Sequence, residues 1–145
     1  TEIKATLESV ELYNRYKKLD KKIVIWQPHK YSRTLDNLPA FKECFKGCDE
    51  LIILPVWSVA EEIKVIDFTK EFTHYNTTLY TSIRTTKGKI ELLNGEEIIR
   101  TIDSGIVLGV GAGDITYQLS NTSESRCGRI SQKRCLIYCE TSCTF

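Results

Sequence analysis

Three short apolar runs stand out along the chain and predict the central strands of a sheet. They are residues 23–26, 51–54 and 106–110, which read IVIW, LIIL and IVLGV. Runs without polar positions are typical of strands that are buried on both faces, as in parallel sheets. Weaker β patterns follow at residues 79–83 and 90–93. The strongest runs therefore predict a buried parallel sheet at the centre of the fold.

Segments with apolar residues at helical spacing separate the strand-like runs. We expect helices over residues 1–19, 35–45, 60–73 and 96–102, and the start of another at residue 115. Alternation of buried strands with amphipathic helices is typical of α/β domains, whose crossover connections are right-handed. The pattern therefore predicts a Rossmann-like α/β fold, an open and mostly parallel sheet with helices on both faces.

The composition narrows the class of protein further. The chain has 145 residues, of which 41% are hydrophobic and 27% are charged, with 20 basic against 19 acidic residues. This length suits one domain, or two small ones, and allows a substantial core, and the apolar fraction is too high for a disordered chain. No apolar run approaches the roughly 18 residues of a membrane span. The balanced charge provides no field that would recruit nucleic acid or an acidic membrane.

The start of the chain has a helical pattern and no recognisable secretory signal, and the whole sequence lacks methionine. Without a secretory signal, reduced thiols are expected for the six cysteines. We therefore expect a cytoplasmic domain that is a piece of a longer protein.

Residues 120–145 differ in composition from the rest of the chain. They are rich in serine and threonine and contain four of the six cysteines, spaced C-x7-C-x3-C-x3-C. Neither the C-x2-C pair nor the nearby histidine of many zinc sites is present. The only apolar cluster is residues 136–138, and we expect no element of the sheet here. We therefore predict a domain over residues 1–119 and a tail outside the fold; a redox or metal-binding appendage is the alternative.

The loop after residues 23–26 carries the most suggestive chemistry. It contains Gln27, His29, Lys30, Ser32 and Arg33. Ligands of open α/β sheets bind at the carboxyl ends of the strands. Cationic groups, an imidazole and a hydroxyl beside a helix N-terminus are suited to bind an anion. We therefore predict an anion-binding site around His29, Lys30 and Arg33; a solvated basic loop is the alternative.

A second loop, after residues 106–110, contains Gly111, Gly113 and Asp114. The glycines would let the backbone approach a ligand, and Asp114 could cap the following helix. A tight strand-to-helix turn is the simpler interpretation, because Thr116 stands where the dinucleotide fingerprint has its third glycine. We therefore expect a turn near the site and assign these residues no chemical role.

The third loop, after residues 51–54, contains Trp57, Glu61 and Glu62. Trp57 is expected in the core or in the wall of a ligand site, and the two carboxylates favour a helix N-terminus. No G-x4-G-K-[ST], G-x-S-x-G or H-E-x-x-H motif occurs in the sequence, and there are only two histidines. The residues alone therefore indicate no catalytic residue and no metal ligand.

Taken in chain order, the loops resemble those of one enzyme family. Residues 27–34, QPHKYSRT, resemble the Q-P-H-R-[FY]-[ST]-R-T segment of the UDP-N-acetylmuramate–L-alanine ligases, which are Mur ligases of peptidoglycan synthesis. Residues 111–115, GAGDI, are similar to the family's G-A-G-[DN]-I segment. Residues 56–61, VWSVAE, stand where the family has V-Y-x-A-G-E, with Ala60 in place of the glycine. The resemblance covers residues 1–119.

The resemblance implies the C-terminal, amino-acid-binding domain of a ligase with three domains. Such an enzyme joins L-alanine to the lactyl carboxylate of UDP-N-acetylmuramate, with ATP and Mg²⁺ bound mainly by the N-terminal and central domains. The third domain closes over the site and helps to hold the amino acid and the reacting anions. His29 and Arg33 match substrate-contacting positions, and Lys30 stands where arginine is usual.

On this resemblance, the 145-residue chain is expected to be inactive by itself, because it lacks the family's nucleotide loop. Two other interpretations stay open. One is a related Mur-type ligase that recycles cell-wall peptides, and the other is a stand-alone module that binds an anion or a nucleotide.

Overall fold

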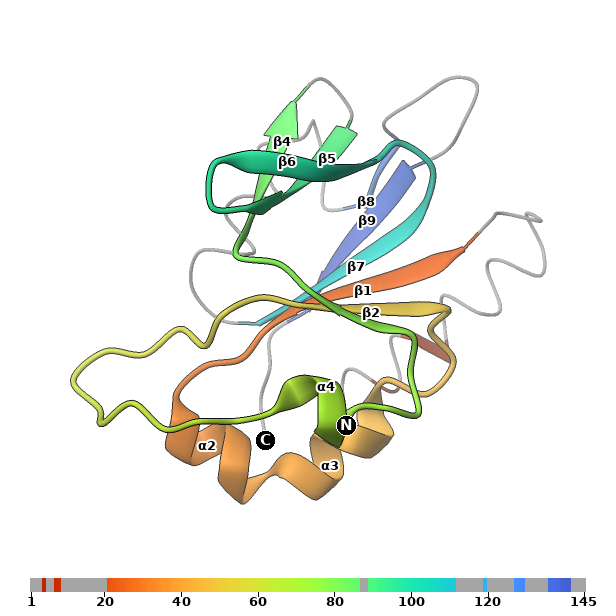
Figure 1. Ribbon diagram of the computed structural model, residues 1–145. Coiled ribbons are helices and arrows are strands. Elements are labelled where there is room, and N and C mark those ends of the chain that lie inside the picture. Colours follow the sequence, from red (N-terminus) through yellow and green to blue (C-terminus); the bar gives the residue numbers. More distant parts are fainter. Residues whose placement is uncertain are drawn as a thin grey trace.

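A six-stranded sheet forms the centre of the protein (Figure 1). The computed structural model describes residues 4, 7, 8, 21–86, 89–111 and 119, and the backbone of residues 127–129 and 136–141. The strand order is β3-β2-β1-β7-β9-β8. The bounds are Lys22–Gln27 for β1, Glu50–Ile53 for β2, Thr77–Leu79 for β3, Gly105–Gly111 for β7, Cys127–Arg129 for β8 and Leu136–Thr141 for β9.

The central strands of this sheet are the three apolar runs of the sequence. Strand β1 lies between β2 and β7 and pairs with both in parallel. Four consecutive residues of β1 and every residue of β2 and β7 are buried. Complete burial explains why these strands lack the polar-apolar alternation of a half-exposed strand. The predicted parallel sheet is confirmed.

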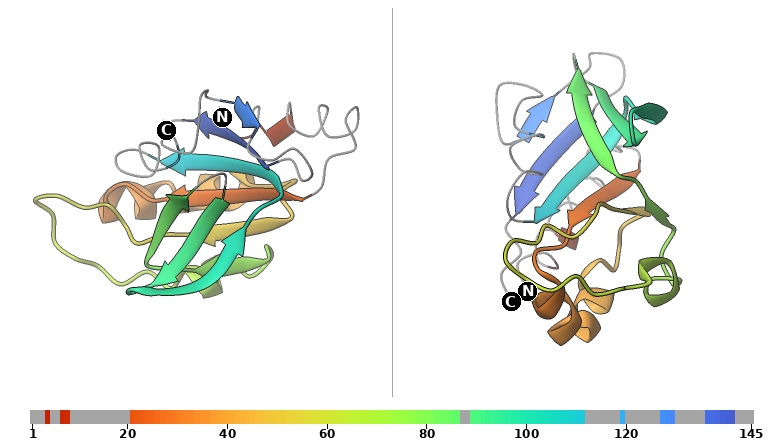
Figure 2. Two further views of the ribbon diagram at one scale, coloured as in Figure 1. Left: turned by 90° about the horizontal axis from the view of Figure 1, so that it is seen from above. Right: turned by 60° about the vertical axis from the view of Figure 1, so that its left-hand side comes forward.

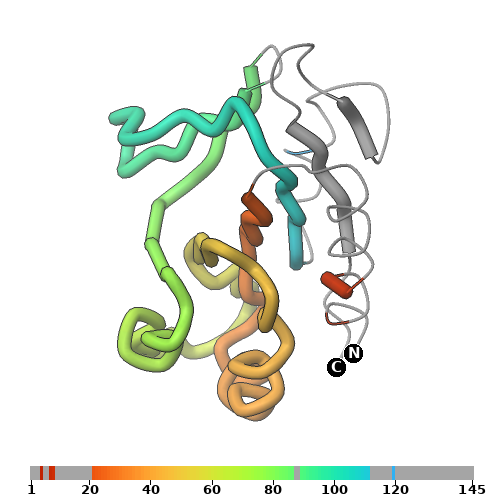
Figure 3. Tube along the Cα trace, turned by 90° about the vertical axis from the view of Figure 1, so that its right-hand side faces the viewer, coloured from red at the N-terminus to blue at the C-terminus, as the bar shows by residue number. Residues whose placement is uncertain are grey.

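Short helices cover one face of this sheet (Figures 1 and 3). Their bounds are Tyr31–Asp36 for α2, Leu38–Cys44 for α3 and Phe68–Glu71 for α4. The indole ring of Trp26 lies at the centre of this layer, with ring-centroid distances of 4.6 Å to Phe41, 5.1 Å to Phe45 and 5.4 Å to Phe72. Tilted and edge-on aromatic pairs of this kind add specific attraction to the burial of apolar surface. Leu7, which is helical, belongs to the same buried cluster.

A small antiparallel sheet covers the other face (Figure 2). Its strands are β4 (Ser82–Thr86), β5 (Lys89–Asn94) and β6 (Glu97–Ile102). Ile90, Leu92 and Ile102 of this sheet share a buried cluster with Ile25 of β1 and Val107 of β7. Leu119, which is helical, joins this cluster. The α/β class is therefore confirmed, with a sheet providing much of the described cover on the second face.

The predicted helix over residues 96–102 is wrong, because this segment is strand β6. Gly95 has a φ of +64° in the turn that returns the chain, and β6 then pairs antiparallel with β5. Ile98 and Ile99 are 43% and 48% exposed. Their spacing from Ile102 resembles a helical face, but these two side chains do not face a core.

The predicted helix over residues 60–73 is correct only for its last part, α4. Asp67 caps α4 by accepting a hydrogen bond from the Lys70 amide at 3.1 Å. Residues 54–67 form a long connection that extends past α2 (Figure 1). Ile63 and Val65 in this connection are 79% and 97% exposed, so their spacing does not form a buried face. The predicted helix over residues 35–45 is present but divided at Asn37 into α2 and α3.

Strands β8 and β9 lie in residues 120–145, where the sequence predicts no element of the sheet. The backbone of β9 pairs in parallel with β7, from Gly105 opposite Leu136 to Val110 opposite Thr141. An unpaired edge of β7 would leave buried backbone groups without partners, which explains why a short apolar segment is paired there. This pairing differs from the expectation for these residues. None of the described helices is long and apolar enough to cross a membrane.

A buried ion pair joins the two sheets. The Glu50 carboxylate on β2 accepts two hydrogen bonds from the Arg100 guanidinium on β6, one of them from Nη2 to Oε2 at 3.0 Å. The Glu50 side chain is 4% exposed and the Arg100 side chain is 35% exposed. A buried carboxylate needs such a partner, because water cannot compensate its charge there.

Replacing Arg100 with methionine should destabilise the fold, because it leaves the Glu50 charge buried without its partner. Loss of one partner of a buried pair typically costs about 3–5 kcal/mol, and the partial exposure of Arg100 favours about 3 kcal/mol. Urea unfolding measures the change. Arg84→Met is the matched control, because Arg84 is 56% exposed and pairs with Glu91 at the surface. Exposed pairs contribute little. Equal losses in both variants would contradict this role of Arg100.

Candidate functional site at the carboxyl edge

The predicted site residues lie where the parallel strands end. We use carboxyl edge for the end of the sheet formed by the last residues of β1, β2 and β7 and the connections that follow them. Gln27, the last residue of β1, is opposite Gly111, the last residue of β7. Helix α2 begins four positions after Gln27. The carboxyl edge is the usual ligand-binding end of an open parallel sheet.

The connections after β1 and β2 are hydrogen-bonded to each other. The Lys30 amide donates to the Trp57 carbonyl at 2.9 Å, and the Trp57 amide donates to the Pro28 carbonyl at 2.8 Å. These bonds form an isolated parallel bridge between His29 and Trp57. Trp57 is 40% exposed, so it belongs to the surface of the carboxyl edge and not to the core. The loop that carries His29 is therefore fixed on one side by the loop that carries Trp57.

Lys30 has an unusual backbone conformation, with φ 62° and ψ 136°. Non-glycine residues avoid this region, and such conformations persist only where the surroundings impose them. The Lys30 carbonyl accepts hydrogen bonds from the Thr34 amide at 3.1 Å and the Thr34 hydroxyl at 2.7 Å. With the Lys30 amide bound to Trp57, both polar backbone groups are held. The exposed Lys30 side chain therefore starts from a strained and well-anchored backbone.

The Glu61 carboxylate accepts hydrogen bonds from the first two backbone amides of α2. Its Oε2 accepts hydrogen bonds from the Tyr31 amide at 2.8 Å and the Ser58 hydroxyl at 2.9 Å, and its Oε1 accepts one from the Ser32 amide at 2.7 Å. Hydrogen bonds from Ser32, through its hydroxyl and its amide, are the main cause that lowers the pKa of Glu61 to about 2, and the Tyr31 amide and Ser58 hydroxyl add to the shift. Hydrogen bonds to the ionised form favour that form.

This contact changes the predicted anion site. The sequence predicts that the start of α2 is open to an external anion, but in the structure the Tyr31 and Ser32 amides bind Glu61. The sequence predicts Glu61 at the N-terminus of a helix, but the helix that Glu61 caps precedes it by about thirty residues. An anion at the carboxyl edge would therefore meet side chains of the loop and not these two amides.

The structure places His29, Lys30 and Arg33 in the same short segment of the carboxyl edge. Arg33 is half-buried in α2, and its carbonyl accepts hydrogen bonds from Asn37. Gly111 is buried at the end of β7 with a φ of 148°, a conformation that favours glycine. Gly113 and Asp114 lie outside the described residues.

Two buried polar atoms beside this segment find no partner in the part of the chain that the structure describes. Oε1 of Gln27 and Nδ1 of His29 have no hydrogen-bond partner among the described residues. Buried polar atoms are nearly always paired, so a polar partner from outside the described residues is expected for both. The sequence places Gln27 in the same loop, but the predicted anion site includes only His29, Lys30 and Arg33.

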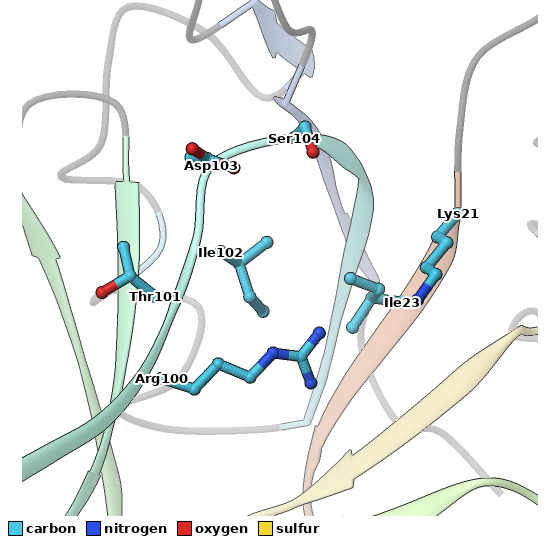
Figure 4. A pocket seen from close by; sticks show the side chains of 7 residues that line it. All are labelled: Lys21, Ile23, Arg100, Thr101, Ile102, Asp103 and Ser104. Carbon is cyan, nitrogen blue, oxygen red and sulfur yellow. The ribbon is translucent and has the colours of Figure 1, made fainter.

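The described residues contain no group of three or more histidine, cysteine, aspartate or glutamate side chains that could bind a metal ion. A pocket of about 300 Å³ lies elsewhere, between the two sheets near the amino end of β1. Lys21, Ile23 and residues 100–104 line this pocket (Figure 4). The Arg100 guanidinium beside it binds Glu50. The predicted site residues are therefore at the opposite end of β1 from this pocket.

Ala60 has a φ of 55°, in the left-handed region that glycine adopts most easily. Alanine stands here at a position where the resembling ligases have glycine. The structure therefore explains why glycine suits position 60, because the chain turns sharply just before Glu61.

Ala60→Gly should stabilise the protein. Relief of the left-handed alanine conformation contributes roughly 1–2 kcal/mol, and the larger entropy of unfolded glycine offsets about 0.4–1 kcal/mol. We expect a net gain of up to about 1 kcal/mol in the free energy of unfolding, measured by urea titration. Ala40→Gly, within α3, is the matched control and should lose about 1 kcal/mol. A loss at both positions would contradict the strained conformation of Ala60.

Comparison with known proteins identifies relatives for most of the chain. A ligase of Helicobacter pylori (strain ATCC 700392 / 26695), named UDP-N-acetylmuramate–L-alanine ligase, is 51% identical over 121 residues. Ligases with the same name are 40% identical in Campylobacter curvus (strain 525.92) and 35% identical in Campylobacter jejuni subsp. doylei. The first two matches cover 82% of this chain and the third covers 86%.

The chain spans 27% of the length of these curated relatives and matches their C-terminal part. No family model and no solved structure matches it. Over about four fifths of its length, the chain is homologous to the C-terminal part of the UDP-N-acetylmuramate–L-alanine ligases, within the Mur ligase family.

Proposed function

We propose that residues 1–119 are the C-terminal domain of an ATP-dependent ligase that joins L-alanine to UDP-N-acetylmuramate. The observation that carries this proposal is the 51% identity to the Helicobacter pylori ligase. The match covers 82% of the chain. Residues 120–145 are then an addition to this domain, and their strand β9 extends its sheet beside β7.

Within this ligase, the loop at the carboxyl edge holds anionic groups of the substrates. His29, Lys30 and Arg33 provide an imidazole and two cationic groups in five positions of the chain. The planar guanidinium of Arg33 can bind a carboxylate or phosphate through two charge-assisted hydrogen bonds. Lys30 provides a single point charge where arginine is usual in the family. The two-pronged contact is therefore assigned to Arg33.

ATP and Mg²⁺ belong to the other domains of the proposed ligase. The sequence has no G-x4-G-K-[ST] loop for the phosphates of ATP. The described residues also offer no cluster of metal ligands. The contribution of this chain is thus to bind and orient the amino acid and the reacting anions in the cytoplasm, when its domain closes over the site.

Exposed apolar side chains beside the site support contact with the other domains. Val59, Ile63 and Val65, in the connection after β2, are 67%, 79% and 97% exposed. Adjacent apolar residues at a surface are typical of contact regions between proteins or domains. This connection also contains Glu61 and Trp57, so the same segment would contact both the other domains and the substrate loop.

A chimeric ligase tests the proposed function. In the Helicobacter pylori enzyme, all 145 residues of this chain replace the matching C-terminal part, so that β9 stays paired with β7. The chimera should release phosphate from ATP in the presence of Mg²⁺, UDP-N-acetylmuramate and L-alanine, and the 145-residue chain alone should not. A folded chimera without L-alanine-dependent turnover, or turnover by the chain alone, would contradict the proposal.

Arg33→Ala in the chimera should lower catalytic efficiency by about ten- to a hundredfold. Loss of a hydrogen bond to a charged group typically costs about 1.5–3 kcal/mol, which corresponds to this range. Arg33→Lys should recover part of the loss, and Lys30→Arg should leave efficiency unchanged or raise it. Steady-state kinetics and thermal midpoints are measured together.

Arg84→Ala is the matched control for Arg33→Ala, because Arg84 is exposed on β4, far along the chain from the substrate loop. It should leave the kinetics unchanged. Normal kinetics for Arg33→Ala would exclude the proposed contact, and slow kinetics with a much lower midpoint would indicate a structural role instead.

A further inference from the structure

The carboxylate of Glu61 connects the two loops of the carboxyl edge at the position of the proposed substrate site. Glu61 belongs to the connection after β2, and the amides that it binds, at 2.7 and 2.8 Å, belong to Tyr31 and Ser32. These two residues stand between Lys30 and Arg33 in the sequence. The contact therefore lies within the segment that supplies the cationic side chains.

Three sets of hydrogen bonds fix the backbone of this segment. The bridge to Trp57 holds its start, the two bonds from Thr34 hold the Lys30 carbonyl, and Glu61 holds the next two amides. Of these anchors, only Glu61 acts through a side chain from the other connection. A substitution can remove it without a change in the backbone of the loop itself.

The same contact decides which groups of the loop meet an anion. Free amides at the start of a helix would attract a carboxylate or phosphate. Here Glu61 already satisfies them with a negative charge, and a second anion beside it would be repelled. Because hydrogen bonds keep the pKa of Glu61 near 2, the carboxylate stays ionised throughout the neutral range.

We propose that Glu61 is a positioning residue for the substrate site, which holds the loop of His29, Lys30 and Arg33 in place and keeps substrate anions off the Tyr31 and Ser32 amides. Substrate anions are then bound by the side chains of the loop, whose positions depend on Glu61. This inference rests on the proposed function for the identity of the substrates, but the contact itself can be tested without activity.

The first experiment uses the complete 145-residue chain and nuclear magnetic resonance. In Glu61→Ala, the Tyr31 and Ser32 amides lose their carboxylate, and added sodium acetate should restore one. We expect acetate to shift these two amide signals further in Glu61→Ala than in the wild-type protein, where only the Lys30 and Arg33 side chains meet acetate, and we expect no such difference with sodium chloride at equal ionic strength. Glu62→Ala, one position along the same exposed connection, is the matched control and should behave as the wild type.

Equal acetate-induced shifts in all three proteins, or Glu61→Ala amide signals identical to those of the wild type, would overturn the inference. If Glu61→Ala does not fold, Glu61→Gln replaces it, because the amide keeps the shape of the side chain and removes the charge. Faster hydrogen exchange at Tyr31 and Ser32 in Glu61→Gln than in Glu62→Gln is then the expected result, and equal exchange would overturn the inference.

The second experiment measures the kinetics of the chimeric ligase. Glu61→Gln should raise KM for L-alanine at least tenfold and change kcat less than threefold, because a displaced loop weakens substrate and transition state alike. Acetate should partly lower the raised KM of Glu61→Ala, and Glu62→Gln should have no effect. A general loss of structure would not raise KM while kcat stays nearly unchanged, and acetate would not reverse it.

The two experiments separate the inference from the proposed function. An inactive wild-type chimera would contradict the proposed function, and the amide signals would still test the contact of Glu61. An active chimera whose KM and kcat are unchanged by Glu61→Gln would overturn the positioning role and leave the proposed function intact.

Discussion

Burial of β1 on both faces is the constraint from which the arrangement of the protein follows. Helices with an aromatic cluster around Trp26 cover one face, and the antiparallel sheet covers the other. Neighbouring strands β2 and β7 occupy both edges of β1. No side chain in the middle of β1 can therefore reach a ligand, and chemistry is confined to the ends of the strand. The residues with cationic and imidazole groups follow its carboxyl end.

At this end, the Glu61 carboxylate binds two of the backbone amides that could otherwise bind an external anion. The first amides of α2 would be attractive to a substrate, but Glu61 binds them and is itself fixed by Ser58. The strained backbone of Lys30 and the left-handed Ala60 stand on the two sides of this contact. Strain of this kind is retained where surrounding interactions impose it. The contact orders the loops and leaves recognition to side chains.

Local patterns predicted the parts of the structure that depend on local burial. The central strands were predictable because each position of β2 and β7 is buried, and the loop with His29 and Arg33 was predictable because it follows such a strand. The spacing of the isoleucines in β6 is that of a helical face and wrongly predicts a helix, because two of these isoleucines are exposed. A periodic pattern gives the spacing of apolar residues in the sequence, and only the tertiary structure shows which of these residues are buried in a core.

The contact of Glu61 and the pairing of β9 could not be predicted for a different reason. Both join segments that are about thirty residues apart, Glu61 with Tyr31 and β9 with β7. Each contact depends on backbone groups that need a hydrogen-bond partner only once the chain has folded. The conformation of Lys30 also has no sequence signal, because its side chain does not favour a positive φ. At position 60 the sequence has alanine where the resembling ligases have glycine, and this is the position at which the structure has a left-handed residue.

The most direct test of this account is a titration of the Glu61 side-chain carboxyl carbon by nuclear magnetic resonance, in the complete chain. We expect a pKa of about 2, because four hydrogen-bond donors favour the ionised form. With the folded pKa below the ordinary value of 4.5, the contact stabilises the protein above about pH 4.5, and this contribution is lost as the pH falls toward 2. The Tyr31 and Ser32 amide signals should shift with the same midpoint. A midpoint near 4.5, with amide signals that do not follow it, would contradict the account.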